Sequence, residues 1–426
     1  MLLQFTVGNY KSFKEKATLS LEAAGDDWLE EENVGITGGR RLLKSAAIYG
    51  PNAGGKSNFL AAMAQFRKWV KNSSKDVQSG EKIPVAPFRL HIDTEAAPTF
   101  FEIVLLHNGA RYRYGFEATA DTVVSEWFFI QKDSIRETCL FTRQGRRIDA
   151  SDAFKEGKGL EERTRPNALF LSVVAQFNGE TAGSMLDWMN RFRSIHGLED
   201  TSYLRFTADR LKDKEYSRLI HELARKADVG IERLKPLDFA PEDAVRSLPS
   251  EVPDEVRRGL LSGELSAFTI KTYHLKYGGG REGGVPVEFD IKADESAGTQ
   301  KFIALTGPFL HTLKNGYTLF VDELEARLHP LLTKALVGLF NSSANTKNAQ
   351  LVFATHDEGL LDPKRIRRDQ IWFVEKDDFG ASRLYSLAEF KGVRKEAKFA
   401  KEYLLGQFGG VPRVGDFEET LTHGGE

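Results

Sequence analysis

The sequence predicts an α/β fold with an N-terminal antiparallel β portion and a helical insertion. Three patterns in the 426 residues indicate this architecture. A glycine-rich turn at 50–57 separates a short apolar run from a helical pattern, as in phosphate-binding α/β proteins. Residues before about 130 alternate in part between apolar and polar, which is typical of strands. Charged segments at helical spacing dominate from about 150 to 265 and favour an inserted helical region.

The elements of the N-terminal part follow from local patterns. Residues 2–10 and 17–23 alternate as strands do, with turn residues between them. Segment 98–130 is predicted to form antiparallel strands, with "HNG" as a hairpin turn. A helix is expected directly after the glycine turn, because apolar residues recur there at helical spacing: Phe59, Met63, Phe66 and Val70.

The rest of the chain divides by composition. The N-terminal lobe is expected at 1–150 and the helical insertion at 151–265. A C-terminal lobe at 266–390 opens with a hairpin whose strands flank a glycine-rich loop. A tail at 391–426 remains.

Two basic clusters occur near the C-terminal end of the sequence. The clusters at 364–368 and 391–401 are typical of solvated helix faces. Phe390, Phe399 and Tyr403 lie among the charges of the second cluster, and they fit an amphipathic helix that docks a partner equally well.

The composition excludes several classes of protein. Lys and Arg number 59 against 61 Asp and Glu, a formal net charge of −2, so binding to DNA would need local patches. The single cysteine, Cys139, excludes internal disulfides and cysteine-based metal sites. No apolar run reaches about 18 residues, so we expect no membrane span and a cytoplasmic protein.

The glycine turn fits the pattern G-x-x-x-x-G-K-[ST] and predicts a nucleotide site. Glycines let backbone N–H groups surround phosphates, the lysine reaches the β and γ phosphates, and the serine hydroxyl binds Mg²⁺. The following helix directs its positive end at the anion. The expected cofactors are ATP and Mg²⁺, and the expected binding residues are Gly50, Pro51, Asn52, Ala53, Gly54, Gly55, Lys56, Ser57 and Asn58.

Two further strands are predicted to complete this site. The run "YTLFVDE" ends in Asp322, which would bind Mg²⁺ through water, and in Glu323, which would activate the attacking water as general base. The run "QLVFATHD" ends near His356, which can hydrogen-bond a γ-phosphate and sense its loss. Lys56 and Asp322 are far apart in sequence, and we expect them to meet across adjacent strands.

The order of the glycine-lysine loop, "LFVDELEARLHP" and "FATHD" resembles the ABC-type ATPases of the SMC, RecF and OLD group. This resemblance implies an ABC-type P-loop ATPase head in which two subunits enclose two ATP molecules. "DESAGTQKF" looks like the family's signature in altered form, so Ser296 and Gly298 would face the γ-phosphate bound by the partner subunit. The run "LLSGELS" at 260–266 is more similar in sequence to the usual LSGG signature, but a predicted hairpin separates it from Asp322.

A narrower resemblance rests on "NYKSF", "RRDQIWFVEKD" and "YLLGQFGGVP". These motifs look like those of the RloA/AbiLi-type ATPases of bacterial antiphage and abortive-infection loci. The resemblance implies a homodimer or higher homo-oligomer formed through ATP. It also implies control of an effector from a neighbouring gene, often a TOPRIM-like nuclease. The alternative is a RecF/SMC-like DNA-repair ATPase that clamps DNA, and a third possibility is a transporter motor.

Some features depart from these families. The glutamine of the ABC-type Q-loop has no clear match, and His329 stands where many relatives carry an aspartate. The run "FVEKDDFG" contains three acids, Glu375, Asp377 and Asp378, that could bind Mg²⁺. About 50 residues follow that run, too few for a TOPRIM domain, so a solvated hairpin turn is the favoured interpretation.

Overall fold

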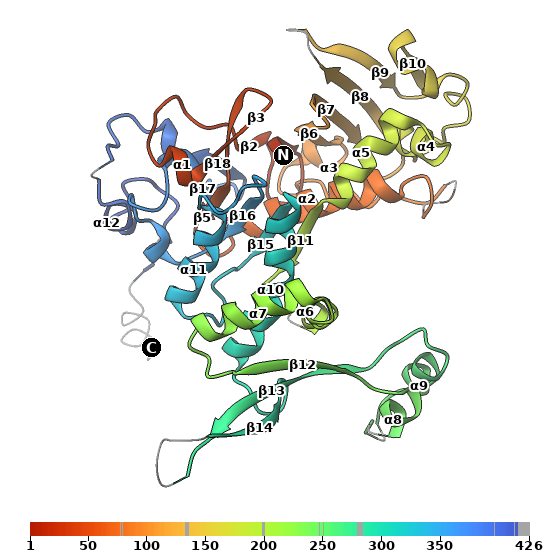
Figure 1. Ribbon diagram of the computed structural model, residues 1–426. Helices are drawn as coiled ribbons and strands as arrows, with labels where there is room; N and C mark the ends of the chain where they lie inside the picture. Colours follow the sequence, from red (N-terminus) through yellow and green to blue (C-terminus); the bar gives the residue numbers. More distant parts are fainter. Residues whose placement is uncertain are drawn as a thin grey trace, which may run out of the picture. The chain divides into compact units, whose positions relative to one another are not determined.

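A computed structural model describes residues 1–76, 78, 80–132, 136–197, 201–246, 248–249, 251–278, 284–395, 397–412 and 414–415. The chain forms two compact units, which are described one at a time (Figure 1). The first unit comprises Met1–Ile195, Gly316–Leu324 and Val337–Glu426, and the second comprises His196–Asn315 and Glu325–Leu336.

The first unit contains a seven-stranded sheet with the order β10-β9-β8-β7-β6-β1-β2. The β6–β7 turn confirms the predicted hairpin, because Asn108 (φ 47°) and Gly109 (φ 77°) take the left-handed conformations of a two-residue turn. The strands are β1 (Leu2–Gly8), β2 (Ala17–Ser20), β6 (Thr99–His107), β7 (Ala110–Ala118), β8 (Val123–Gln131), β9 (Thr138–Gln144) and β10 (Arg147–Ala150).

A second, six-stranded sheet has the order β11-β15-β16-β5-β17-β18. Its central strands pair in parallel and are buried on both faces, which explains their continuous apolar sequences. Strand β18 is antiparallel to its neighbour, β17. The strands are β11 (Phe192–His196), β15 (Thr318–Asp322), β16 (Gln350–Ala354), β5 (Ser45–Tyr49), β17 (Ile371–Lys376) and β18 (Ser382–Ser386).

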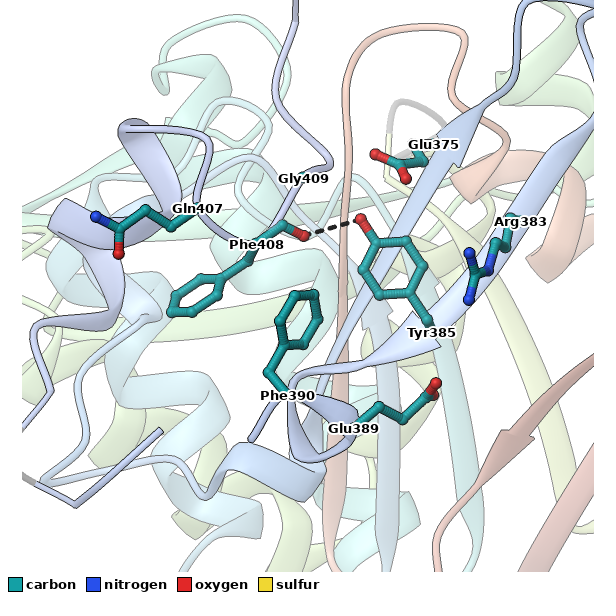
Figure 2. A pocket seen from close by; sticks show the side chains of 8 residues that line it. All are labelled: Glu375, Arg383, Tyr385, Glu389, Phe390, Gln407, Phe408 and Gly409. Atoms are coloured by element: carbon teal, nitrogen blue, oxygen red, sulfur yellow. Dashed lines mark hydrogen bonds between the residues drawn. The ribbon is translucent and has the colours of Figure 1, made fainter. Parts of the chain in front are cut away.

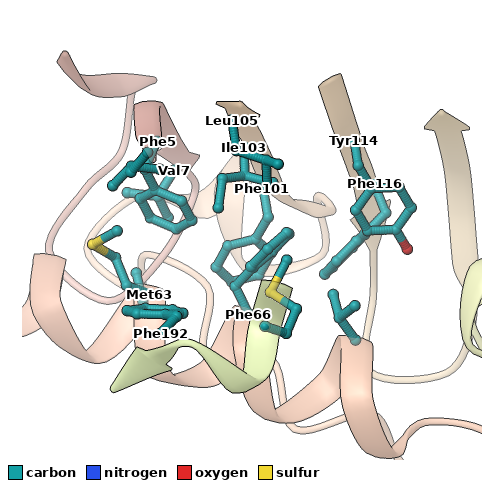
Figure 3. Packing of buried hydrophobic residues seen from close by; sticks show 14 of the residues in the cluster. Phe5, Val7, Met63, Phe66, Phe101, Ile103, Leu105, Tyr114, Phe116 and Phe192 are labelled. Carbon is teal, nitrogen blue, oxygen red and sulfur yellow. The ribbon is translucent and has the colours of Figure 1, made fainter. Parts of the chain in front are cut away.

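Helix α2 (Lys56–Asn72) packs between these two sheets of the first unit. Its apolar face follows the predicted spacing, and the four predicted residues are all buried. The Phe66 ring stacks on Phe116 of β7 with centroids 5.6 Å apart and meets Phe5 of β1 edge-on at 5.7 Å. Figure 3 shows side chains of β1, β6 and β7 directed at this helix. The helix that begins at the glycine turn is therefore held by the core of the unit.

Shorter elements complete the first unit. The tail contains a short helix that packs against the parallel sheet through Tyr403, which meets Tyr49 of β5. These elements are α1 (Glu30–Asn33), β3 (Val34–Thr37), β4 (Arg40–Leu43), α3 (Ile92–Glu95), η1 (Asp152–Gly157), α4 (Phe170–Gln176), α5 (Glu180–Asn190), η2 (Glu358–Leu360), η3 (Arg368–Gln370), η4 (Leu387–Glu389) and α12 (Phe399–Leu404). Helix α11 (Pro330–Phe340) runs across the boundary between the units in sequence.

The second unit contains a helical group and a three-stranded sheet, β12-β13-β14. Helix α10 packs closely on α6, where Thr207 Oγ1 donates to the carbonyl of Ala304 at 2.8 Å. The predicted hairpin is confirmed as β13–β14, and its loop at 279–283 lies outside the described residues. The elements are α6 (Thr201–Leu211), α7 (Lys214–Lys226), β12 (Arg233–Asp238), α8 (Pro241–Arg246), α9 (Asp254–Leu261), β13 (Phe268–Lys276), β14 (Val285–Asp290) and α10 (Ala297–Asn315).

The boundaries of the units differ from the expected 1–150, 151–265, 266–390 and 391–426. Residues 151–195 belong to the first unit, because Phe154 and Phe170 pack on Phe141 of β9 at ring distances of 5.4 and 4.9 Å. The β13–β14 hairpin and α10 belong to the second unit. A helical charge pattern reports the solvent-facing side of a helix, and it does not show which sheet covers the other side.

Candidate nucleotide-binding site

The glycine turn joins β5 to α2 and has the geometry of a phosphate loop. Gly55 precedes the helix with φ 124°, and a Cβ there would lie 2.5 Å from Ser382 Oγ. A Cβ at Gly50 would overlap the carbonyl oxygen of Val374 on β17. Glycine is therefore required at both positions, because the loop lies directly against β17 and β18.

Lys56 is the first residue of α2 and its side chain lies along the loop. Its Nζ donates to the carbonyls of Gly50 at 2.8 Å and Pro51 at 3.1 Å, and the residue is 6% exposed. Ser57, the next residue, is exposed at the N-terminus of the helix. The loop thus places an ammonium group and a hydroxyl beside the backbone N–H groups that begin the helix, as phosphate and metal binding require.

Two serines that sequence patterns did not single out support this loop. Ser382 Oγ donates to the carbonyl of Gly54 at 2.6 Å, and its backbone N–H donates to the carbonyl of Ser12 at 2.6 Å. Asn58 Nδ2 in turn donates to Ser12 Oγ at 2.8 Å. Ser12 belongs to the motif "NYKSF", which could have indicated its role at the loop. No motif in the sequence pointed to Ser382.

The carboxyl ends of three parallel strands meet at the same edge of the sheet. Val321 pairs with Phe353 across β15 and β16, and Ala354 pairs with Ile48 across β16 and β5. Because parallel strands in this register end together, the residues that follow them share one edge. The structure therefore brings together the phosphate loop, the pair Asp322 and Glu323, and His356.

Lys56 and Asp322 do not follow adjacent strands, so that expectation was wrong. Strand β16 lies between β5 and β15 and pairs with both. The two strands are thus two spacings of roughly 4.8 Å apart. In this order His356, which follows β16, comes from the strand between the one that leads into the loop and the one that carries the acidic pair.

The three polar residues at this edge differ in solvent exposure and in backbone conformation. Asp322 is buried at 6% exposure, Glu323 is half-buried and His356 is exposed. Glu323 has φ 48°, a left-handed conformation that non-glycine residues seldom adopt. Observed strain of this kind is frequent at functional sites, where surrounding structure holds a side chain in a required direction.

Ser57 and Asp322 are the residues that could hold Mg²⁺ in this unit. A hydroxyl and a carboxylate are the hard oxygen donors that Mg²⁺ prefers, and this ion usually keeps several waters. Both residues lie at the edge where the phosphate loop ends. The donor chemistry therefore fits the predicted ion.

Ser296 and Gly298 lie in the second unit, at the start of α10. Ser296 Oγ accepts a hydrogen bond from the N–H of Thr299 at 3.1 Å, so this exposed serine caps the helix. A Cβ at Gly298 would lie 2.8 Å from the carbonyl oxygen of Arg327, which explains the glycine. The competing motif at 260–266 lies at the C-terminal end of α9, where the helix dipole disfavours an anion.

The acidic run near residue 375 is a hairpin turn, as the favoured interpretation predicted. Asp377 Oδ1 accepts from the backbone N–H groups of Phe379 at 2.9 Å and Ala381 at 2.8 Å, closing the β17–β18 turn. Among the described residues, no group of three or more His, Cys, Asp or Glu is placed to hold a metal ion. No helix in the described part of the chain is long and apolar enough to cross a membrane.

The aromatic residues of the tail do not form an exposed face, which corrects the expectation for Phe399 and Tyr403. Phe399 is 0% exposed against Trp28, and Tyr403 is 6% exposed against Tyr49. Phe390 is half-buried. The aromatic periodicity of this helix therefore reports its packing onto the first unit.

Comparison with known protein families gives the family of this chain. A family model matches residues 45–362, which are 318 of the 426 residues; its description is an AAA domain, with the AbiEii toxin and Type IV TA systems also mentioned. No curated protein matches the chain.

Similar solved structures include heads of SMC proteins and RecF. The SMC head domain from Thermotoga maritima is 13% identical over 90% of this chain and 98% of its own, with a TM-score of 0.41. The Smc head domain bound to the C-terminal domain of ScpA, derived from Pyrococcus furiosus, is 13% identical over 90% and 96%, with a TM-score of 0.35. The recombination mediator RecF is 13% identical over 90% and 98%, with a TM-score of 0.30.

Proposed function

Because this chain belongs to the AAA-domain family whose model matches residues 45–362, we propose that it is a Mg²⁺-dependent ATPase that dimerises head to head on ATP. The observation that carries the proposal is the shared edge of β5, β15 and β16. That edge gathers a phosphate-loop lysine, an acidic pair and a histidine from segments far apart in sequence.

Each residue has a role that its position supports. Lys56 and the N–H groups of the loop bind the β and γ phosphates, and Ser57 and Asp322 hold the ion, which neutralises phosphate charge when bound. Glu323 accepts a proton from the attacking water as general base. His356, which follows the strand between them, donates a hydrogen bond to the γ-phosphate and loses that partner after hydrolysis.

Ser296 and Gly298 complete the site of the other subunit. A 19-residue helix that begins beside an exposed serine presents N–H groups and the positive end of its dipole to an anion. The anion in question is the γ-phosphate bound by the partner. ATP therefore joins two subunits, and hydrolysis releases them.

We further propose that this cycle regulates a separately encoded effector in antiphage defence. The mention of a toxin and of toxin–antitoxin systems in the family's description supports a two-component arrangement. A TOPRIM-like nuclease encoded beside the ATPase is the effector we expect. Nucleotide state changes the population of dimers, and a bound effector responds to that change.

The proposal is tested with Glu323→Gln, which keeps the shape of the side chain and removes the base. We expect ATP binding to persist, turnover to fall by roughly 100-fold or more, and dimers to accumulate with ATP. Turnover and mass in solution are measured in parallel, with Glu358→Gln as a matched control because this exposed carboxylate lies two residues after His356. Near-normal turnover in Glu323→Gln contradicts the role of general base.

The same variant, purified from its native host with ATP present, tests the regulatory role. Recovery of one stoichiometric protein encoded next to the ATPase, identified by mass spectrometry, supports a regulated effector. Recovery of DNA alone, removed by nuclease treatment, would move the protein to the RecF-like alternative that clamps DNA.

A further inference from the structure

In the first unit, the side chains around a cavity of about 450 Å³ beside the β17–β18 hairpin hold the C-terminal segment (Figure 2). The Tyr385 hydroxyl donates to the carbonyl of Phe408 at 2.9 Å, as the figure shows. Glu375 Oε2 accepts from the N–H of Gly410, also at 2.9 Å. These contacts attach the segment to the parallel sheet and need no ligand.

A buried carboxylate in the second unit lies directly before the serine assigned to the partner's γ-phosphate. Glu295 precedes Ser296 in "DESAGTQKF", and its side chain is 7% exposed, whereas residues 292–294 and Ser296 are exposed. A carboxylate is seldom buried without hydrogen-bond partners, because removing its charge from water costs free energy. The partners of Glu295 therefore indicate what its burial achieves.

Two side chains of β13 hold this carboxylate. The Thr272 hydroxyl donates to Glu295 Oε1 at 2.5 Å, and His274 Nε2 donates to the same oxygen at 2.6 Å. Thr272 and His274 are two residues apart on a strand, so they project from the same face of the sheet. The His274 ring lies against Phe289 of β14, with ring centres 4.8 Å apart. This face of the sheet thus presents two donors to one carboxylate oxygen.

The backbone around Glu295 carries this fixed position to Ser296. The Glu295 carbonyl accepts from Gln300 Nε2 at 2.9 Å, and the N–H of Gln300 donates to the carbonyl of Ser296 at 2.9 Å. Ser296 therefore lies between a side chain anchored on β13 and the first turn of α10. Without that anchor, Ser296 could move together with the N–H groups that begin the helix.

The same contacts direct a negative charge onto the sheet. A carboxylate turned toward the start of α10 would repel a γ-phosphate there, since both groups are negatively charged. Hydrogen bonds from Thr272 and His274 hold the Glu295 carboxylate against β13 instead.

We infer that Glu295 is a positioning residue for Ser296, and that Thr272 and His274 of β13 hold it in place. The three-stranded sheet of the second unit thereby determines how well one chain completes the ATP site of the other. This inference rests on the proposed function, in which Ser296 acts across the two subunits.

A heterodimer with one active site tests the inference. One chain carries Ser296→Arg and the other carries Lys56→Ala, so the complete site uses ATP of the first chain and Ser296 of the second. Glu295→Gln, which keeps the side-chain shape and removes the charge, is then added to either chain. In the Lys56→Ala chain we expect turnover to fall by roughly fivefold, because weaker hydrogen bonds to a neutral acceptor loosen the acting serine. In the Ser296→Arg chain the change should stay below about twofold, since that helix faces the empty site.

The two placements separate positioning from a general loss of stability, which would affect both chains alike. An equal loss of turnover in both placements, or no loss in either, overturns the inference. Absence of turnover in the heterodimer that lacks Glu295→Gln contradicts the proposed function instead. Hydrogen exchange then still reports whether Glu295 holds Ser296.

Hydrogen exchange tests the positioning without any turnover. In the full chain without nucleotide, Glu295→Gln should raise the amide exchange rates of Thr299 and Gln300 by roughly threefold or more. The N–H groups of these two residues bond to the side chain and the carbonyl of Ser296, so they report its movement. Exchange rates that stay unchanged in Glu295→Gln contradict the inference, whatever the turnover.

Glu288→Gln is the matched control for both measurements. Glu288 lies on β14 of the same sheet, and its side chain is 51% exposed. Its carboxylate accepts from the Tyr273 hydroxyl at 2.7 Å, on the face of β13 opposite Thr272 and His274. We expect neither the turnover nor the exchange rates at the start of α10 to change in this variant. Changes equal to those of Glu295→Gln would show a general effect of the sheet and overturn the inference.

Two substitutions of His274 separate its hydrogen bond from its packing. Gln keeps an N–H donor for Glu295, whereas Leu fills similar space without a donor. In the Lys56→Ala chain of the heterodimer, we expect His274→Leu to lower turnover by roughly threefold and His274→Gln to retain more than about half of it. Equal losses in the two variants would contradict the role assigned to this donor.

Discussion

Ser382 contributes to the nucleotide site by holding the backbone of the phosphate loop. Its hydroxyl donates to the buried carbonyl of Gly54, and its N–H donates to Ser12. Gly55 can approach this serine because it lacks a Cβ. The phosphate loop is therefore positioned by a strand that lies more than 300 residues later in the sequence.

Ser382→Ala should weaken ATP binding more than it weakens catalysis. Removing the hydroxyl leaves the Gly54 carbonyl buried without that donor, which costs on the order of 1 kcal/mol and loosens the loop. We expect the KM for ATP to rise by roughly fivefold while kcat changes by less than about twofold. Ser386→Ala is the matched control, because Ser386 Oγ donates to Ile371 on the same pair of strands, away from the loop. Equal KM values in the two variants would contradict the supporting role of Ser382.

Arg367 corrects the interpretation of the basic cluster at 364–368. The residue is 0% exposed, and its guanidinium pairs with Asp369 at 2.7 Å and Asp26 at 3.1 Å. It also donates to the backbone carbonyl of Trp28. This arginine joins the N-terminal loops to the parallel sheet, so the cluster is not a uniformly solvated face. In the sequence, the acidic residue Asp369 two positions after Arg367 was the feature that could have indicated a buried ion pair.

At the scale of elements, buried charges decide where α4 begins. Glu126 of β8 accepts from the N–H groups of Phe170 at 2.8 Å and Leu171 at 3.0 Å, at the start of this helix. Arg143 of β9 lies 3.6 Å from the same carboxylate, and both residues are about 1% exposed. The contact explains why a helix predicted as part of the insertion belongs to the first unit.

His107, the last residue of β6, should make the free energy of unfolding depend on pH. Burial, with Arg191 nearby, lowers the pKa of His107 to about 4, from 6.5. Between these values the unfolded chain binds the proton and the folded chain does not, so stability decreases as pH falls from 7 toward 5. The contribution of His107 to this loss at pH 5 is on the order of 1–2 kcal/mol.

His107→Gln should reduce the decrease in stability between pH 7 and pH 5. Urea denaturation at these two pH values would measure the difference. His91 is the matched control, because its side chain is 42% exposed in the same unit. We expect His91→Gln to leave the pH dependence unchanged. An identical decrease in stability in the His107→Gln variant and the unmodified chain would exclude His107 as its source.

At the scale of the whole molecule, we propose that each ATP is bound between two chains, with Ser296 of one chain at the site of the other. The phosphate loop, the acidic pair and His356 lie in the first unit, whereas Ser296 lies in the second. Ser296→Arg should therefore abolish turnover and leave ATP binding to the isolated chain intact. ATP binding lost in the monomer would place Ser296 in its own subunit's site.

Mixing of variants tests this arrangement directly. A heterodimer of Ser296→Arg with Lys56→Ala contains one intact composite site, so an equal mixture should regain up to about a quarter of normal turnover. Glu323→Gln mixed with Lys56→Ala is the control, because both changes affect the same half of the site and no intact site results. Absence of recovery in the first mixture, with dimers present, contradicts action across the subunits.

The sequence by itself determined the local features of this protein. The phosphate loop, the helix after it, the antiparallel strands with their Asn-Gly turn and the β13–β14 hairpin all follow from glycine geometry and from apolar periods of 2 and 3.6 residues. Residue types alone also predicted the acidic pair after an apolar strand. Each of these depends on interactions between residues close together in the chain.

Only the tertiary structure decided the order of strands and the partners of buried groups. It placed β16 between β5 and β15, buried Phe399 and Tyr403, and brought Ser382 to the phosphate loop. Periodicity shows which face of an element is apolar, but it does not show which element covers that face. Strand order and long-range hydrogen bonds depend on packing between distant segments, which a local pattern does not encode.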